Sequence, residues 1–173
     1  MRVLLIVLLT LLNPYKEERE VIVTQKKITV SGQTSIGGFN CGFQKNGLKD
    51  TLYIDHSNNK KELIFEIPVR DFSCGNFLLN RDFRKTIKAE DFPTAKVKVN
   101  NLISSYGNYS CDLYVDIVGK KLFYDNLILK RSVDGVVAHL TLSFEELELE
   151  APQKFGGLVK VEEELKLEFK LSF

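Results

Sequence analysis

The 173-residue sequence has no tryptophan and only two histidines and three cysteines. The histidines, His56 and His139, are far apart, and no Cys-x-x-Cys or His-x-x-x-His spacing occurs. Zinc sites normally have closely spaced ligands, so no metal site is predicted. The sequence also has no G-x-S-x-G elbow and no glycine-rich phosphate loop with its lysine. It therefore predicts no catalytic residue and no cofactor, and an enzyme is the least favoured hypothesis.

Strong charge of one sign and long apolar runs are missing too. The formal net charge is +1 and lysines alternate with acids, which argues against a nucleic-acid partner. The longest apolar run, VLLIVLLTLL, is too short to cross a bilayer as a helix and matches the h-region of a secretory signal. We expect a signal peptide over residues 1–16, with no evident cleavage site, and one periplasmic or secreted domain over residues 17–173.

Alternation of apolar and polar residues dominates the rest of the chain and predicts antiparallel strands. The last strand is the clearest, because every second residue from Leu165 to Phe173 is apolar. Asn46-Gly47 and Asp134-Gly135 predict hairpin turns. Polar residues 25–27 are expected to break the first strand region. Residues 145–150 are expected to extend a later strand as an acidic edge.

The predicted fold is all-β, an up-and-down antiparallel barrel of about eight strands. A barrel is preferred to a sandwich because closure removes the strand edges that would otherwise aggregate. About eight strands enclose an interior that is either filled by side chains or holds one small ligand, and strand pattern alone does not choose between these.

A short helical insertion is predicted near residues 76–91. Leu79, Phe83 and Ile87 recur at four-residue spacing, so one helix face is apolar and should cover an apolar surface. Asn80 is the expected N-cap, and Pro93 is expected to stop the helix. Such an insertion between two strands can cap one mouth of the barrel.

The same stretch resembles the YceI-like family, whose members are exported bacterial proteins with a lipocalin-like barrel. Some members bind polyisoprenoid lipid. The resemblance extends over most of the domain and is strongest at Phe72, Cys74, Gly75, Asn76, Leu79, Asn80, Arg81, Asp82, Phe83, Lys85, Thr86, Ile87, Lys88, Ala89, Phe92 and Pro93.

The resemblance implies a disulfide between Cys41 and Cys74, with Cys111 as a buried, inert thiol. Three buried free cysteines are the alternative. If the barrel is hollow, its inward faces and the helix should line the cavity. The predicted lining residues are Phe39, Phe43, Ile54, Phe65, Ile67, Leu79, Phe83, Val97, Leu113, Val115, Leu140, Leu142, Leu167 and Phe169.

The leading hypothesis is an exported lipid-binding protein that holds an isoprenoid or similar apolar ligand for transport or storage. Its expected partner is an apolar lipid such as a polyisoprenoid, and a transient membrane contact is left open. The alternative is a protein-interaction module with a filled barrel, which would use the acidic edge at residues 145–150 or its loops.

Overall fold

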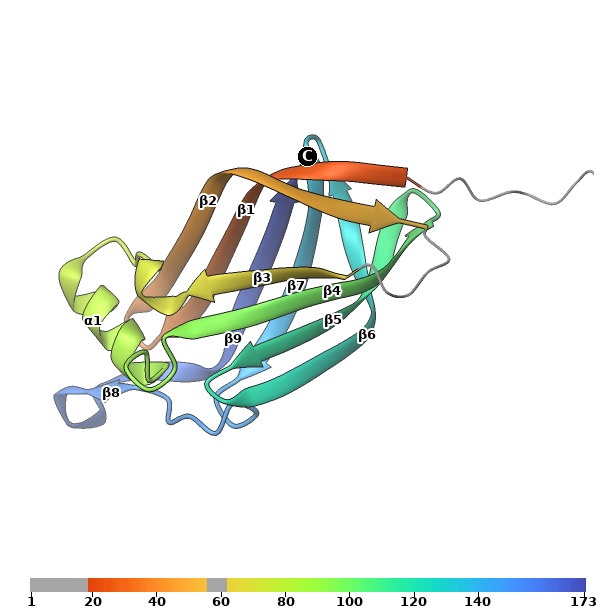
Figure 1. Ribbon diagram of the computed structural model, residues 1–173. Coiled ribbons are helices and arrows are strands. Elements are labelled where there is room, and N and C mark those ends of the chain that lie inside the picture. Colours follow the sequence, from red (N-terminus) through yellow and green to blue (C-terminus); the bar gives the residue numbers. More distant parts are fainter. Residues whose placement is uncertain (1–18, 56–61) are drawn as a thin grey trace, which may run out of the picture.

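The computed structural model describes residues 19–55 and 62–173. The predicted signal peptide over residues 1–16 lies outside them. Within the described residues, eight antiparallel strands form a nearly closed barrel in the order β2-β1-β9-β7-β6-β5-β4-β3, with the short β8 paired to β9 (Figure 1). The elements are β1 (Arg19–Thr34), β2 (Gly37–Ile54), β3 (Leu63–Pro68), η2 (Val69–Asp71), α1 (Phe77–Thr86), β4 (Thr94–Ser105), β5 (Asn108–Ile117), β6 (Lys120–Ser132), β7 (Gly135–Ser143), β8 (Gln153–Lys154), η3 (Phe155–Gly157) and β9 (Val159–Ser172).

The predicted barrel with one helical insertion is therefore confirmed. Alternate residues of the strands enter a single apolar core, except where bulges interrupt the pattern, because strand side chains alternate between the two faces of a sheet. Phe65, Ile67 and Leu171 are among the most deeply buried side chains. The predicted hairpin joins β6 to β7, but its two turn residues are Val133 and Asp134, and Gly135 is the first residue of β7. Gly135 is required there, since a Cβ at this position would overlap the carbonyl oxygen of Leu171.

Two predictions about the first strands were wrong. Residues 25–27 do not break a strand, and Asn46-Gly47 does not form a hairpin, because β1 and β2 are single long strands that pair with each other along their length. A bulge between Val23 and Gln25 shifts the register of the β1–β2 pair, so both strands continue past residues 25–27 and Asn46-Gly47. Gly47, with φ +69, bends β2 opposite this bulge instead of reversing the chain.

The bulge also changes which residues of β1 face inward. Val23 is buried before the bulge, and the even-numbered Lys26 and Ile28 are buried after it. Lys26 is consequently only 4% exposed inside an apolar core. Its ammonium group lies 4.9 Å from the centre of the Phe65 ring and 5.8 Å from that of Phe43. Alternation alone would not have placed a lysine there.

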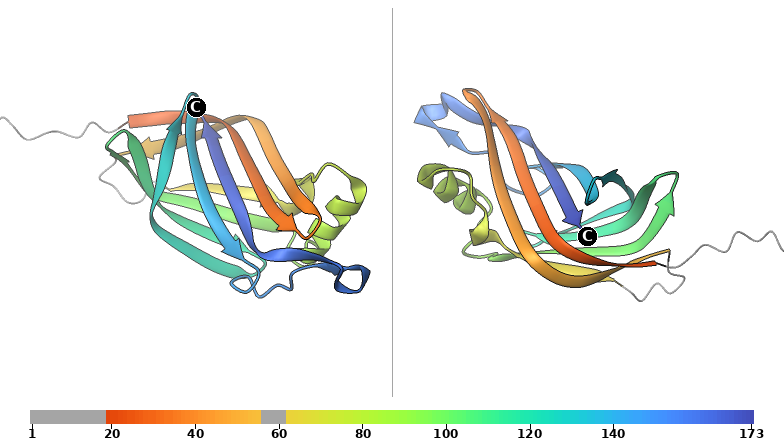
Figure 2. Two further views of the ribbon diagram at one scale, coloured as in Figure 1. Left: turned by 180° about the vertical axis from the view of Figure 1, so that it is seen from behind. Right: turned by 90° about the horizontal axis from the view of Figure 1, so that it is seen from above.

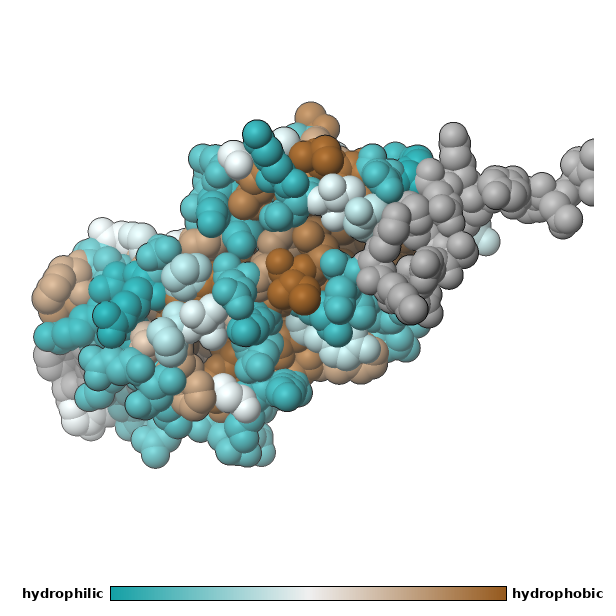
Figure 3. Space-filling model, in the orientation of Figure 1, coloured by the Kyte–Doolittle hydropathy of each residue, from teal (hydrophilic) through white to brown (hydrophobic). Residues whose placement is uncertain are grey.

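The seam of the barrel lies between β2 and β3, which share no ladder among the described residues. At one end, Gly42 and Ser73 exchange two backbone hydrogen bonds of 2.9 Å. At the other end, the amide of Asp55 donates to the carbonyl of Leu102 at 2.9 Å. Between them, Lys26 Nζ donates to the carbonyl of Glu66 at 3.2 Å. Apolar side chains gather over β3 beside this seam, where Ile64 is half exposed (Figure 3).

Burial lowers the pKa of Lys26 from its ordinary value of 10.5, an effect reinforced by Lys45 and opposed by Asp50. Between the lowered pKa and 10.5, the unfolded chain holds a proton at this residue that the folded protein has lost. The unfolding free energy should therefore rise with pH through that window. Lys26→Met should abolish this rise. The measurement is the free energy of unfolding in urea, determined for the wild type and the variant from neutral to alkaline pH. Parallel curves for the two proteins would contradict the prediction.

Two further expectations are corrected. Residues 145–150 are not a strand edge: β7 ends at Ser143, and the chain turns so that Leu147 and Leu149 are buried. The helix begins earlier than expected, because the N-cap is Asn76, whose side chain accepts a 2.9 Å hydrogen bond from the amide of Leu79. The helix proper ends at Thr86, and turns lead from there to Pro93.

Candidate functional site

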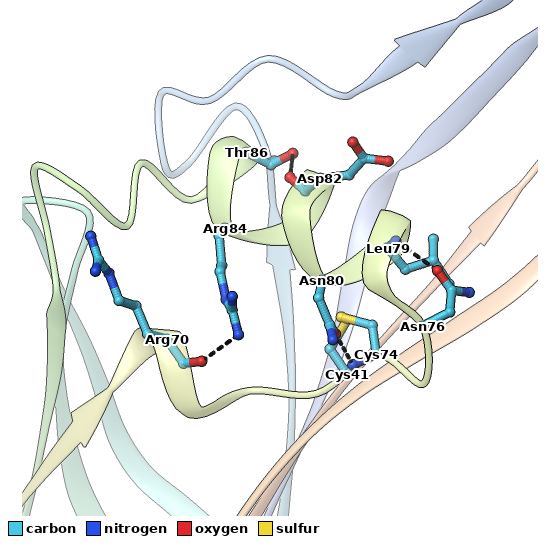
Figure 4. Close-up of a disulfide and its surroundings, with 9 residues drawn as sticks. All are labelled: Cys41, Arg70, Cys74, Asn76, Leu79, Asn80, Asp82, Arg84 and Thr86. Carbon is cyan, nitrogen blue, oxygen red and sulfur yellow. Dashed lines mark hydrogen bonds between the residues drawn. A yellow bond between two sulfur atoms is a disulfide. The ribbon is translucent and has the colours of Figure 1, made fainter.

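The insertion that carries α1 is fastened to the barrel mainly through its first residues (Figure 4). A disulfide joins Cys41 of β2 to Cys74, the pair implied by the family resemblance. Asn80, one turn into the helix, accepts a 2.6 Å hydrogen bond from the amide of Cys74. Arg84 Nη2 donates to the carbonyl of Arg70 at 2.8 Å. These contacts fix where α1 starts and how it is oriented over the barrel end.

Aromatic rings connect the helix with the core. The ring of Phe83 lies 5.4 Å from that of Phe72, which lies 5.7 Å from that of Phe43. Despite this, α1 has no buried residue, and Leu79 on its apolar face remains 37% exposed. The helix therefore covers the barrel end without being packed tightly into it.

An apolar pocket of ≈ 130 Å³ lies between α1 and the barrel. Its walls come from β1, β2, α1, β9 and the segments around Phe144 and Pro152, and they are almost entirely apolar. Gly32 contributes indirectly: a Cβ there would lie 2.6 Å from the Phe39 ring, so the glycine lets that ring lie against β1. The lining residues are Val30, Thr34, Phe39, Cys41, Leu79, Asp82, Phe83, Thr86, Ile87, Phe144, Pro152, Val159, Val161 and Leu165.

Three of the predicted lining residues, Phe39, Leu79 and Phe83, are in this lining. The remaining predicted residues lie in the packed core, except Leu167, which is half-buried against the core. Contact of these residues with a ligand stays a prediction. The core residues are Phe43, Ile54, Phe65, Ile67, Val97, Leu113, Val115, Leu140, Leu142 and Phe169. The space is thus at the mouth under the helix, whereas these inward faces pack against one another.

Several lining residues were not predicted. Ile87 was expected on the apolar helix face and Leu165 on the inward face of the last strand, so both had a recognisable signal. Phe144 had one too, because it continues the apolar face of Leu140 and Leu142. Val161 had none, because it follows an acidic and loop-like stretch whose path along the pocket the sequence does not indicate.

Beside the pocket lies an open cleft of ≈ 1340 Å³ whose two walls carry opposite charge. Arg81, Lys85 and Lys88 line the α1 side, and Glu145, Glu148 and Glu150 are among the acids on the other. The pKa of Glu148 is lowered by its hydrogen bond to Lys120, with a smaller contribution from the charge of Lys88. Asp82, Thr86 and Pro152 border both spaces, so the apolar pocket opens into a polar surround.

The remaining cysteine and the charged groups offer little chemistry. Cys111 is free and buried, and burial, with Asp112, raises the pKa of its thiol to about 12. The thiolate, which is the reactive form, is therefore scarce at neutral pH. In the described part of the chain, no group of three or more His, Cys, Asp or Glu side chains could hold a metal ion. Over residues 19–55 and 62–173, no helix is long and apolar enough to cross a bilayer.

Similarity to known proteins is found in the structure and not in the sequence. No family model and no curated protein matches the sequence. Among solved structures, BcnA from Burkholderia cenocepacia is similar with a TM-score of 0.55 and 14% identity, over 83% of this chain and 94% of that one. A polyisoprenoid-binding domain from Saccharophagus degradans, implicated in plant cell wall breakdown, is similar with a TM-score of 0.54 and 12% identity, over 89% of this chain and 95% of that one.

The chain has the YceI-like fold. At these identities the likeness concerns the arrangement of the backbone, and the residues of the site have to be judged from their own geometry. In this protein the barrel has its apolar pocket under the helical insertion.

Proposed function

We propose that this protein is an exported lipid-binding protein that holds an isoprenoid or similar long apolar chain, for transport or storage, with α1 as the lid of its site. It acts by binding and not by catalysis. The observation that carries the proposal is the apolar pocket of ≈ 130 Å³ between an amphipathic helix and the barrel. Each methylene that enters such a site contributes about 0.8 kcal/mol, so a chain can be held without any polar recognition group.

The size of the pocket limits what it holds in the described conformation. Sites for whole small ligands usually measure about 300–1,000 Å³. The ≈ 130 Å³ under α1 therefore accommodates only a segment of a long chain. A longer segment requires α1 to move outward. No helix residue is fully buried, so this movement separates partly buried contacts, such as that of Phe83 with Phe72, while the disulfide keeps the start of the insertion in place. We propose that α1 lifts to admit the chain and settles on it afterwards.

Other features support the finer parts of the proposal. The Saccharophagus degradans domain, which shares this fold, is a polyisoprenoid-binding domain. The apolar run of residues 3–12 supports export. The Cys41–Cys74 disulfide also supports it, since disulfides persist mainly in oxidising compartments.

The test is mass spectrometry of an organic extract from the mature protein, purified under native conditions without detergent. We expect a long-chain isoprenoid or comparable lipid in about equimolar amount, and its loss from protein denatured before extraction. If the extract stays empty after incubation with membrane lipids, the proposal fails, and the interaction module on a filled barrel becomes the better explanation.

A further inference from the structure

The barrel end that holds the pocket carries an apolar rim, formed by Ile36, Phe77, Leu78 and Leu158. These side chains are 77%, 76%, 57% and 79% exposed, respectively. They come from three separate elements: the turn between β1 and β2, the first turn of α1, and the residue preceding β9. Large apolar side chains exposed to this degree around one opening mark a site of interaction.

The rim lies beside residues that line the apolar pocket. Each of its members is within two residues of a lining residue: Ile36 follows Thr34, Leu78 precedes Leu79, and Leu158 precedes Val159. The β1–β2 turn is held against the start of β9, because Ser35 Oγ donates to the carbonyl of Leu158 at 3.0 Å. Two further views show this turn, α1 and the β8 segment together at one end of the barrel (Figure 2).

Basic side chains lie on the same helix, α1, as two residues of the rim. Arg81, Arg84 and Lys85 are exposed on the helix whose first turn supplies Phe77 and Leu78. Arg81 and Lys85 also line the charged cleft, whose other wall is acidic, so Arg84 is the one of these three that does not face that wall. Long basic side chains can extend to the phosphate level of a bilayer while apolar neighbours insert below it. This arrangement complements the phosphates of a phospholipid surface.

We propose that the apolar rim docks this protein on a phospholipid bilayer, with the pocket mouth facing the acyl chains. This inference rests on the proposed function, since it supplies the route by which an apolar chain passes between membrane and pocket without crossing water. A bilayer fits better than a protein partner because the rim consists of separate projecting tips. Tips of this kind insert into a fluid layer without needing a complementary rigid surface.

The experiment measures co-sedimentation of the mature protein with vesicles of phosphatidylcholine alone and with added phosphatidylglycerol. The test variant is Phe77→Ser/Leu78→Ser, and the matched control is Tyr106→Ser/Val133→Ser. Tyr106 and Val133 are fully exposed apolar residues in turns at the opposite end of the barrel, and neither lines the pocket. All four substitutions are at exposed positions, so folding should be retained, as circular dichroism would verify.

We expect the wild type and the control to partition onto both vesicles, more strongly with phosphatidylglycerol. The Phe77→Ser/Leu78→Ser variant should bind both kinds of vesicle at least about tenfold more weakly. It should still bind a water-soluble short-chain prenol like the wild type, because neither residue lines the pocket. Prenol binding without vesicle binding by the wild type overturns the docking inference and leaves the proposed function standing. Equal loss in test and control variants also overturns it, whereas absence of prenol binding contradicts the proposed function itself.

Discussion

Removing the disulfide is expected to lower the free energy of unfolding by about 3–4 kcal/mol. The bridge joins Cys41 and Cys74, which are 33 residues apart, and a loop of that length loses considerable freedom in the unfolded chain when it is closed. Cys41→Ala/Cys74→Ala should show this loss in urea denaturation. The wild type treated with a reducing agent should show a loss of similar size.

Cys111→Ala is the matched control, since Cys111 is equally buried and makes no bridge. Its loss reports the cost of deleting one buried sulfur, which we expect to be clearly smaller than that of the double variant. If the double variant and reduced wild type unfold within about 1 kcal/mol of the oxidised protein, the bridge does not stabilise the fold as described.

The disulfide also connects stability with the site. Cys41 lines the pocket, and the amide of Cys74 donates to the side chain of Asn80 within α1. Breaking the bridge should therefore loosen the start of the helix and accelerate the release of a bound lipid as well. The release rate can be measured as the transfer of a fluorescent prenol analogue to acceptor vesicles. Measured well below the unfolding temperature, it distinguishes this positioning role from a purely global loss of stability.

The strands of this fold could be predicted because alternation reports directly which side chains leave water. The pattern Leu165, Leu167, Phe169, Leu171 places one face of β9 against the core, as the structure has it. The bulge could not be predicted from the sequence, because a bulge depends on the pairing of two strands and not on one local pattern. The burial of Lys26 and the bend at Gly47 are both consequences of the same bulge between β1 and β2.

The site could be predicted only in part for a related reason. Periodicity indicates on which side of a strand a residue lies, but not whether the space in front of it is already occupied. Phe65 and Phe39 both face inward in the sequence pattern. Phe65 meets the ring of Phe169 at 5.9 Å in the packed core, whereas Phe39 borders the pocket under α1. That difference arises from α1, which buries none of its own residues and whose position depends on the disulfide and on Asn76 and Asn80.

Filling the pocket should abolish most of the lipid binding while leaving the fold intact. Val161 is a half-buried residue of β9 that lines the pocket of ≈ 130 Å³. In Val161→Phe, the added ring would occupy space that a lipid chain otherwise enters. Exclusion of two methylenes, at about 0.8 kcal/mol each, already corresponds to an affinity loss of roughly tenfold or more.

Glu162→Phe provides the matched control, because Glu162 is the next residue of β9 and is exposed. It adds the same ring to the same strand without entering the pocket, so it should retain the wild-type affinity in a fluorescent prenol titration. The two variants should also unfold at similar denaturant concentrations, since an aromatic ring at position 161 fills existing space and does not displace packed atoms. Unchanged prenol affinity in Val161→Phe would mean that the chain does not enter under α1, and the lid role of the helix would have to be abandoned.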